Sequence, residues 1–262
     1  MRADVTLFDL RLRRRSLLGY TAGMALYALV VVALYPQFKN SLSLNQLTKH
    51  GSAVAALFGA TGTLTSPAGW LSANIYANFL PLIMLLITIG YGAACIAGQD
   101  EDGTLSLTTT LPLTRRSILL QKTASLAAQA VLLGAATMAC AAAGRGFDLV
   151  VPAANLAGIT IGVILASIDF GLLALAVGCW TGSRGTALGI ASAAAAASYL
   201  ISSLAPVVSW LGPARYASLL YWSTGNNQLT TGLPATSIAV LTAAGLTLLA
   251  LAGLGFRRLD LH

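Results

Sequence analysis

Long uninterrupted apolar segments, separated by shorter polar ones, dominate the pattern of this chain. Each contains about 20 residues, which as a helix is long enough to cross a hydrocarbon core of about 30 Å. The pattern predicts an all-α integral membrane protein with six transmembrane helices in a single domain, residues 1–262. The predicted spans cover residues 16–35, 79–97, 123–143, 155–180, 186–205 and 237–256.

Composition strengthens this assignment of class. Of the 262 residues, 56% are hydrophobic and 9% are charged, whereas about 25% of the residues of a soluble domain are charged. A chain with so little charge cannot cover a water-exposed globular surface. The sequence also shows no internal repeat and no inserted soluble domain.

The first 15 residues differ from the rest because arginines alternate there with apolar side chains. This pattern predicts a short amphipathic helix over residues 1–15 that lies at the membrane interface. The apolar run that follows is longer than the core of a signal peptide and ends in Leu34-Tyr35-Pro36 without a cleavage site. We therefore expect an uncleaved first span.

The distribution of basic residues predicts the orientation. If the N-terminus lies inside, the inner side carries eleven basic residues: Arg2, Arg11, Arg13, Arg14, Arg15, Arg115, Arg116, Lys122, Arg184, Arg257 and Arg258. The outer side then carries four: Lys39, Lys49, Arg145 and Arg215. This asymmetry predicts that both termini are cytoplasmic. The net charge of +7 forms no basic stripe with interleaved aromatic residues, so we expect no nucleic-acid partner.

The densest charge cluster, "GQDEDGTLSLTTTLPLTRRS" (98–117), lies between the second and third spans. Asp100, Glu101 and Asp102 are the residue types that stabilise the N-terminus of a following helix. Leu107 and Leu111 lie four residues apart and would share one side of such a helix. The pattern predicts a short cytoplasmic helix in this connection.

The end of the same connection has its own signals. Pro112 would end the short helix. Thr114 can cap the next helix, whose first turn carries Arg115 and Arg116. An ordinary charged loop would account for the arginines through the topology rule, but not for the acids.

Two long outer segments, 36–78 and 206–236, are rich in aromatic residues. These residues are Trp70, Tyr76, Trp210, Tyr216, Tyr221 and Trp222. They are typical of an interfacial belt or of re-entrant packing, and direct contact with a substrate is the alternative.

The sequence lacks the residue patterns of an enzyme. His50 and His262 are isolated, and no Gly-Lys pair exists from which a phosphate-binding P-loop could be built. Cys95, Cys140 and Cys179 fall within predicted spans and are typical of small apolar packing residues. An integral-membrane enzyme is therefore the least favoured class, and we expect neither a metal nor a nucleotide on this chain.

Asp169 is the single ionisable residue deep inside a predicted span. An intramembrane carboxylate has to face the bundle interior or a water-filled cavity. It can be a structural contact between helices or the coupling site of an ion-driven secondary transporter. A proton relay requires a second partner in the membrane, and neither such a partner nor an inverted repeat is visible.

The stretch "AGQDEDGTLSLTTTLPLTRRSILLQK" (97–122) resembles the first cytoplasmic loop of the ABC-2 type exporter permeases. The matching residues are Glu101, Gly103, Thr104, Leu105, Pro112, Arg115, Arg116, Ile118, Leu119 and Lys122. Gln99-Asp100 stands where the family often has Gly-Glu. The segments "LFGATGTLTSPAGWL" (57–71) and "WLGPARY" (210–216) are similar to outer segments of the antibiotic-exporter branch.

The resemblance implies a function. The connection would hold a coupling helix that docks into a separate ATPase. Two permeases, as a homodimer or pseudo-dimer in contact with membrane lipid, would work with two ATP-binding subunits that carry ATP and Mg²⁺. The assembly would export its substrate across the plasma (inner) membrane of a bacterium, and an apolar, weakly charged path suits a hydrophobic or amphipathic cargo such as a drug, an antibiotic or a lipid-like molecule. The ATPase-coupling loop would comprise Asp100, Glu101, Asp102, Gly103, Thr104, Leu107, Leu111, Pro112, Arg115 and Arg116.

Overall fold

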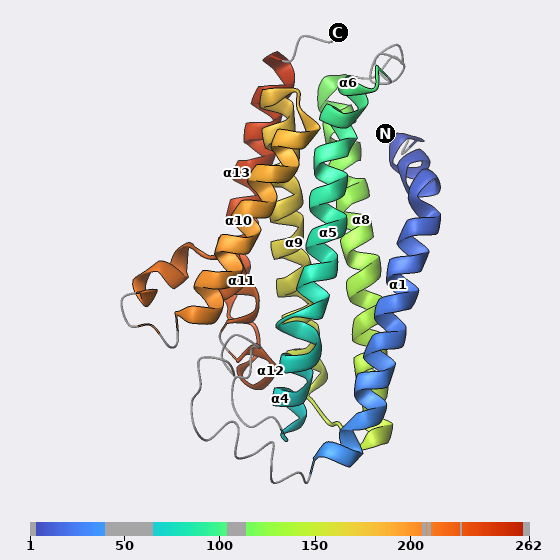
Figure 1. Ribbon diagram of the computed structural model, residues 1–262, viewed down its shortest axis with the longest axis vertical. Helices are drawn as coiled ribbons and strands as arrows, with labels where there is room; N and C mark the ends of the chain where they lie inside the picture. The colour runs from blue at the N-terminus through green and yellow to red at the C-terminus, as the bar shows by residue number, and fades with distance from the viewer. Residues whose placement is uncertain are drawn as a thin grey trace.

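The computed structural model describes residues 4–39, 65–103, 114–205, 208, 211–225 and 227–258. The regular elements of this described part are helices. Six of them are long and apolar enough to cross a membrane, which confirms the predicted number of spans. Figure 1 shows them as a bundle of roughly parallel helices, in which both ends of the described chain lie at one end of the bundle. We call this the termini end.

The spans are built from the following elements. The first is α1 (Asp4–Phe38), and the second joins α4 (Pro67–Leu71), η1 (Ser72–Tyr76), α5 (Phe79–Ala93), η2 (Ala94–Gly98) and α6 (Gln99–Glu101). The third is α8 (Arg115–Ala142) with η3 (Ala143–Phe147), and the others are α9 (Ala153–Thr181), α10 (Arg184–Leu204) and α13 (Ala235–Arg258). Between α10 and α13 lie η5 (Pro213–Ala217), α11 (Leu219–Thr224) and α12 (Gln228–Thr231).

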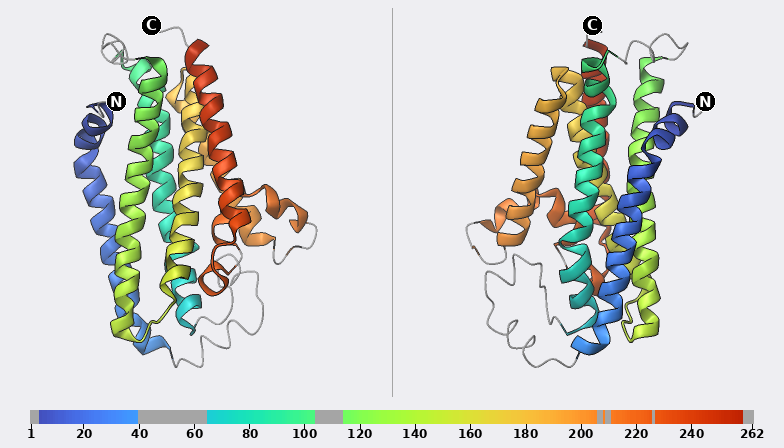
Figure 2. Two further views of the ribbon diagram at one scale, coloured as in Figure 1. Left: turned by 180° about the vertical axis from the view of Figure 1, so that it is seen from behind. Right: turned by 45° about the vertical axis from the view of Figure 1, so that its right-hand side comes forward.

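Helix α9 is the centre of the bundle. It is the most buried of the six spans and packs against α5, α8, α10 and α13, whereas α1 packs mainly against α8 (Figure 2). Small residues permit the closest approach, as is common between membrane helices. At the crossing of α5 and α9, Gly92 faces the backbone carbonyl of Gly171, where a Cβ atom would collide.

The second span is longer than predicted and runs over Pro67–Glu101. Ser66 caps its start by accepting a hydrogen bond from the Gly69 N–H at 3.1 Å, and Pro67 occupies the first turn, where it costs no hydrogen bond. Tyr76, which was expected among the outer aromatics, is fully buried within this span. Its hydroxyl shares a hydrogen bond of 3.0 Å with Thr160 of α9.

The expected interfacial helix over residues 1–15 is not a separate element. Residues 4–15 form the first turns of α1, because no glycine or proline interrupts the helix before Gly19. Thr6 also fastens these turns to α8 by donating a hydrogen bond to the Gln121 carbonyl at 3.0 Å.

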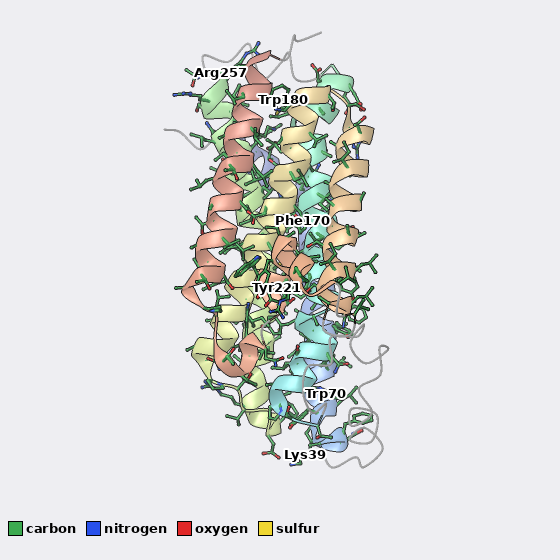
Figure 3. All side chains as sticks on the ribbon, turned by 90° about the vertical axis from the view of Figure 1, so that its left-hand side faces the viewer. Lys39, Trp70, Phe170, Trp180, Tyr221 and Arg257 are labelled. Atoms are coloured by element: carbon green, nitrogen blue, oxygen red, sulfur yellow. The ribbon has the colours of Figure 1, made fainter. Side chains whose placement is uncertain are left out.

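The segment between α10 and α13 folds back against the bundle. Ser198 of α10 and Ser218 share a buried hydrogen bond of 2.8 Å, and the Leu220 N–H donates to the Ser198 hydroxyl at 3.2 Å. Tyr221 is buried, whereas Tyr216 is exposed. In Figure 3, Tyr221 lies beside the helices well away from the termini end, where Trp180 and Arg257 lie. Trp210 lies outside the described residues.

Candidate functional site

The described part of the predicted coupling loop leaves the second span at the termini end. The span ends at α6, where Gly103 has a φ of 66° and donates its N–H to the Asp100 carbonyl at 3.0 Å. Glycine occupies this left-handed position without the penalty that a Cβ atom brings. Residues 104–113 lie outside the described residues, and with them the predicted helix and Thr104, Leu107, Leu111 and Pro112.

Glu101 has a role that the sequence did not indicate. Its carboxylate Oε1 accepts a hydrogen bond of 2.9 Å from the backbone N–H of Arg184, the first residue of α10. A carboxylate at a helix N-terminus is stabilised by the unpaired N–H groups and by the helix dipole. The acid therefore stabilises the start of the fifth span and links the second span to the fifth.

The neighbouring acids differ in their surroundings. One carboxylate oxygen of Asp100 is buried and has no hydrogen-bond partner among the described residues, whereas Asp102 is exposed. Gly98 also lies close to Arg184: a Cβ atom on Gly98 would be 3.2 Å from the Arg184 Cδ. The end of the second span and the start of the fifth therefore form one packed unit.

The start of α8 confirms the predicted cap. The Thr114 hydroxyl accepts a hydrogen bond from the Ser117 N–H at 3.2 Å. Arg115 then donates to the Phe256 carbonyl of α13 at 2.7 Å, and its guanidinium lies 5.6 Å from the centre of the Phe256 ring. Arg116 is exposed. Of the two predicted loop arginines, Arg115 joins the third span to the sixth.

A buried ion pair joins α1 to α8. The Lys122 Nζ lies 2.9 Å from one carboxylate oxygen of Asp9 and 3.1 Å from the other, and the two side chains are 1% and 6% exposed. The Tyr91 hydroxyl of α5 donates to Asp9 at 2.6 Å. Arg13 lies over the Tyr91 ring, 5.0 Å from its centre. This Asp9–Lys122–Tyr91 network connects the first three spans.

Sequence reasoning missed this network. Lys122 was interpreted as a topology-setting charge and as a residue that matches the family loop, and Asp9 was not singled out. The available signal was a carboxylate next to the run of arginines, because a buried charge requires a partner of opposite sign and further hydrogen bonds.

Asp169 is buried in α9, with 2% of its surface exposed. It faces α13 at Gly245, where a Cβ atom would lie 2.6 Å from the Asp169 Oδ1. Its Oδ2 has no hydrogen-bond partner among the described residues. The carboxyl group therefore lies against a helix surface without a side chain.

An exposed ion pair lies at the opposite end of the bundle. The Lys39 Nζ, just after α1, donates to the Asp148 Oδ2 at 2.8 Å. The Asp148 carboxylate raises the pKa of Lys39 above its usual value, and the ammonium group in turn lowers the pKa of Asp148. The described residues contain no cluster of three or more residues suited to holding a metal ion.

Six helices long and apolar enough to cross a membrane are typical of a multi-pass membrane protein. The model of a family described as ABC-2 family transporter protein matches residues 5–261. The chain therefore belongs to the ABC-2 family of transporter proteins, as its loop sequence suggested, and is an ABC-2 type permease. The family implies association with an ABC ATP-binding subunit. Comparison with curated proteins gives no match.

Proposed function

We propose that this chain is the transmembrane permease subunit of an ATP-driven exporter, and that ATP is hydrolysed by a separate ABC ATP-binding subunit. The observation that carries the proposal is the Glu101–Arg184 hydrogen bond. It lies in the loop that resembles the ATPase-coupling loop of the family. A force on this loop would reach the second and fifth spans together, since the second span ends and the fifth begins at this contact.

The proposed orientation places the termini end in the cytoplasm. The elements at this end carry nine described basic residues: Arg11, Arg13, Arg14, Arg15, Arg115, Arg116, Lys122, Arg184 and Arg257. The segments of the other side carry Lys39, Arg145 and Arg215. An excess of arginine and lysine is typical of the cytoplasmic side. A cytoplasmic ATPase would then meet Asp100, Glu101, Asp102 and the connection that follows them.

The proposed transporter contains two copies of this chain and two ATP-binding subunits, which hold the ATP and Mg²⁺. Helices α1 and α10 are among the least buried spans of the single chain, so they have large faces left for a second copy or for lipid. The exposed face of α10 carries small residues, including Gly189, Ser192, Ala193 and Ala196, which permit close contact between helices. The substrate path would follow this interface and suits a hydrophobic or amphipathic molecule, exported across a bacterial inner membrane.

Purification from the native membrane in mild detergent tests the proposal, with mass spectrometry and an ATPase assay of the purified material. Asp102→Lys reverses a charge at an exposed loop position, and Arg145→Glu is the matched control at the opposite end of the bundle. We expect an ATPase to copurify in near-equal amount with the wild type and the control, and to be lost or uncoupled in Asp102→Lys. A chain without an ATPase, purified from cells that express its partners, would contradict the proposal.

An ion-coupled secondary transporter is the alternative, and the observation that favours it is the Asp169 Oδ2, which has no hydrogen-bond partner in the described part of the chain. Asp169→Asn keeps the shape of the side chain but cannot bind or release a proton. The alternative predicts gradient-driven transport without ATP that this variant abolishes. The exporter proposal predicts ATP-dependent transport that survives it.

A further inference from the structure

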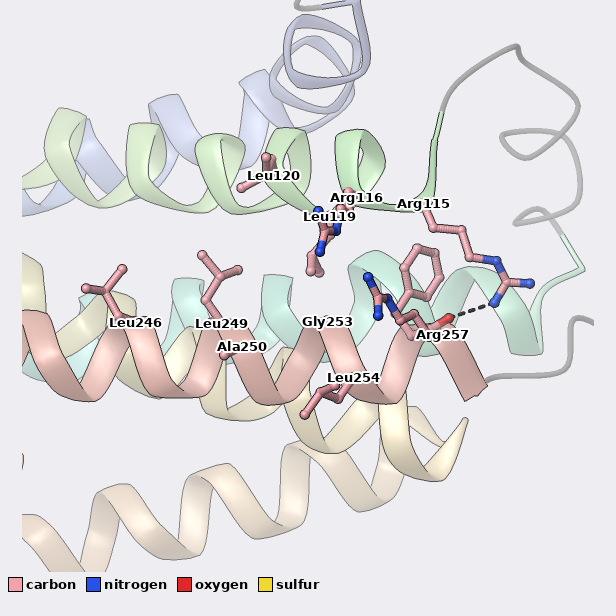
Figure 4. Close-up of a pocket in the computed structure, with 11 residues that line it drawn as sticks. Arg115, Arg116, Leu119, Leu120, Leu246, Leu249, Ala250, Gly253, Leu254 and Arg257 are labelled. Carbon is pink, nitrogen blue, oxygen red and sulfur yellow. Dashed lines mark hydrogen bonds between the residues drawn. The ribbon is translucent and has the colours of Figure 1, made fainter.

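A cavity of about 570 Å³ opens between α8 and α13 at the termini end (Figure 4). Its volume lies within the range of about 300–1,000 Å³ found for ligand sites. The walls are leucines of the two helices, with Gly253 between them: Leu119 and Leu120 from α8, and Leu246, Leu249 and Leu254 from α13. These two helices make few contacts with each other, and both pack on α9.

The open side of this cavity faces outward from the bundle. Leu120, Leu246 and Leu254 are 48%, 63% and 51% exposed. Leucines with that exposure on membrane-spanning helices contact hydrocarbon rather than water. The cavity is therefore a groove in the lipid-facing surface.

Three arginines lie at the end of the groove: Arg115 and Arg116 in the first turn of α8, and Arg257 in the last turn of α13 (Figure 4). None of the described residues that line the groove is acidic. Arg115 is held against α13 by its hydrogen bond to Phe256, whereas Arg116 and Arg257 are exposed. Because they lie at helix ends, these arginines are at the depth where phospholipid headgroups meet the hydrocarbon core.

We propose that this groove binds an anionic phospholipid, with its phosphate at Arg116 and Arg257 and one acyl chain along the leucine walls. Guanidinium groups bind phosphate oxygens through paired hydrogen bonds, and basic pockets between membrane helices are typical sites for acidic lipids. A second copy of this chain would bring apolar side chains to the walls, but would give the exposed Arg116 and Arg257 no negative charge to bind. The charge at the groove therefore favours the lipid.

Native mass spectrometry of the purified chain, with phosphatidylglycerol or phosphatidylcholine added, tests the headgroup contact. In Arg116→Gln/Arg257→Gln we expect phosphatidylglycerol retention to fall about fivefold per arginine removed, while the weaker retention of phosphatidylcholine, whose headgroup has no net charge, falls less. Arg14→Gln/Arg15→Gln removes two exposed charges from α1 at the same end and should leave retention as in the wild type. Equal losses in both variants would overturn the proposal.

A second variant tests the acyl-chain contact. A Cβ atom at Gly253 would lie 3.6 Å from the Leu119 Cδ2, an ordinary contact distance, so Gly253→Leu fills the groove without disturbing the helices. We expect it to lower retention of both lipids while the melting temperature is kept. Unchanged retention, or a disulfide-linked dimer formed through Leu120→Cys in membranes, would overturn the proposal. Since no ATPase takes part, the result is independent of the proposed exporter function.

Discussion

Glu101 and Arg184 lie far apart in the sequence, yet the carboxylate of Glu101 accepts a hydrogen bond of 2.9 Å from the backbone N–H of Arg184. The contact makes one mechanical unit of the end of the second span and the start of the fifth. In the proposed exporter, this is where movement of an ATPase would enter the membrane domain.

Replacing Glu101 should weaken this unit in two steps. Glu101→Gln retains an acceptor for the Arg184 N–H but loses the charge at the helix N-terminus, so we expect a loss of less than about 1 kcal/mol. Glu101→Ala removes the acceptor as well and should cost about 1 kcal/mol more. Thermal unfolding in detergent measures stability, and hydrogen exchange at the first turn of α10 measures the local effect. Equal protection of this turn in the wild type and in Glu101→Ala would contradict the role.

The Asp9–Lys122 ion pair leads to a second prediction. Because both side chains are buried, Lys122→Met leaves the carboxyl group of Asp9 buried and without its main partner. We expect a loss of about 3–5 kcal/mol. Asp9→Asn should cost less, because the amide oxygen can still accept from Lys122 and Tyr91.

The double variant Asp9→Leu/Lys122→Met is the informative control. Replacing both charges of a buried pair with apolar groups is often neutral or stabilising. The double variant should therefore be more stable than Lys122→Met alone, as measured by the melting temperature in one detergent. Additive losses would mean that the two residues act independently.

Gly92 allows a third prediction, which concerns the crossing of α5 and α9. Gly92→Ala directs a Cβ atom at the backbone carbonyl of Gly171, and such overpacking costs about 1–3 kcal/mol. Gly90→Ala, in the same helix, meets nothing within 4 Å and should retain the gain in helix propensity of up to about 1 kcal/mol. Melting temperatures should therefore shift in opposite directions, and equal shifts would contradict the packing.

The exposed pair of Lys39 and Asp148 should give a pH dependence. Since the pKa of Asp148 is lowered in the folded chain, the ion pair stabilises the folded chain fully above the usual carboxyl pKa of about 4. This stabilisation is lost as the pH falls further. Since the pKa of Lys39 is raised, the stabilisation persists up to the usual lysine pKa of about 10 and is lost above it. Asp148→Asn should lower the melting temperature slightly at pH 7 and by less at pH 3. Asparagine also tolerates the left-handed backbone at this position.

The sequence alone predicted much of the fold. Apolar segments of membrane-spanning length predicted the six helices, and Thr114 predicted the start of α8. The extension of the second span back to Pro67 was missed because its small and aromatic residues look like an outer loop. The continuity of α1 was missed because charge patterning distinguishes its two halves, although the backbone is helical throughout.

The candidate site was less predictable, because its contacts join residues distant in sequence. The sequence shows that the acids at 100–102 can stabilise a helix N-terminus. It does not show that the helix stabilised by Glu101 is α10. Likewise the sequence does not show that Lys122 pairs with Asp9, since this pairing depends on how α1 packs against α8. Periodicity indicates which faces are apolar, whereas the pairing of rare charges is decided by helix packing.

The central claim is that the termini end docks an ATP-binding subunit. A photo-reactive amino acid at position 102, with position 145 at the opposite end as the matched control, tests it most directly in the native membrane. We predict a cross-linked product that contains an ABC ATP-binding subunit from position 102 and none from position 145. The absence of that product from position 102, or its formation from position 145, would contradict the account.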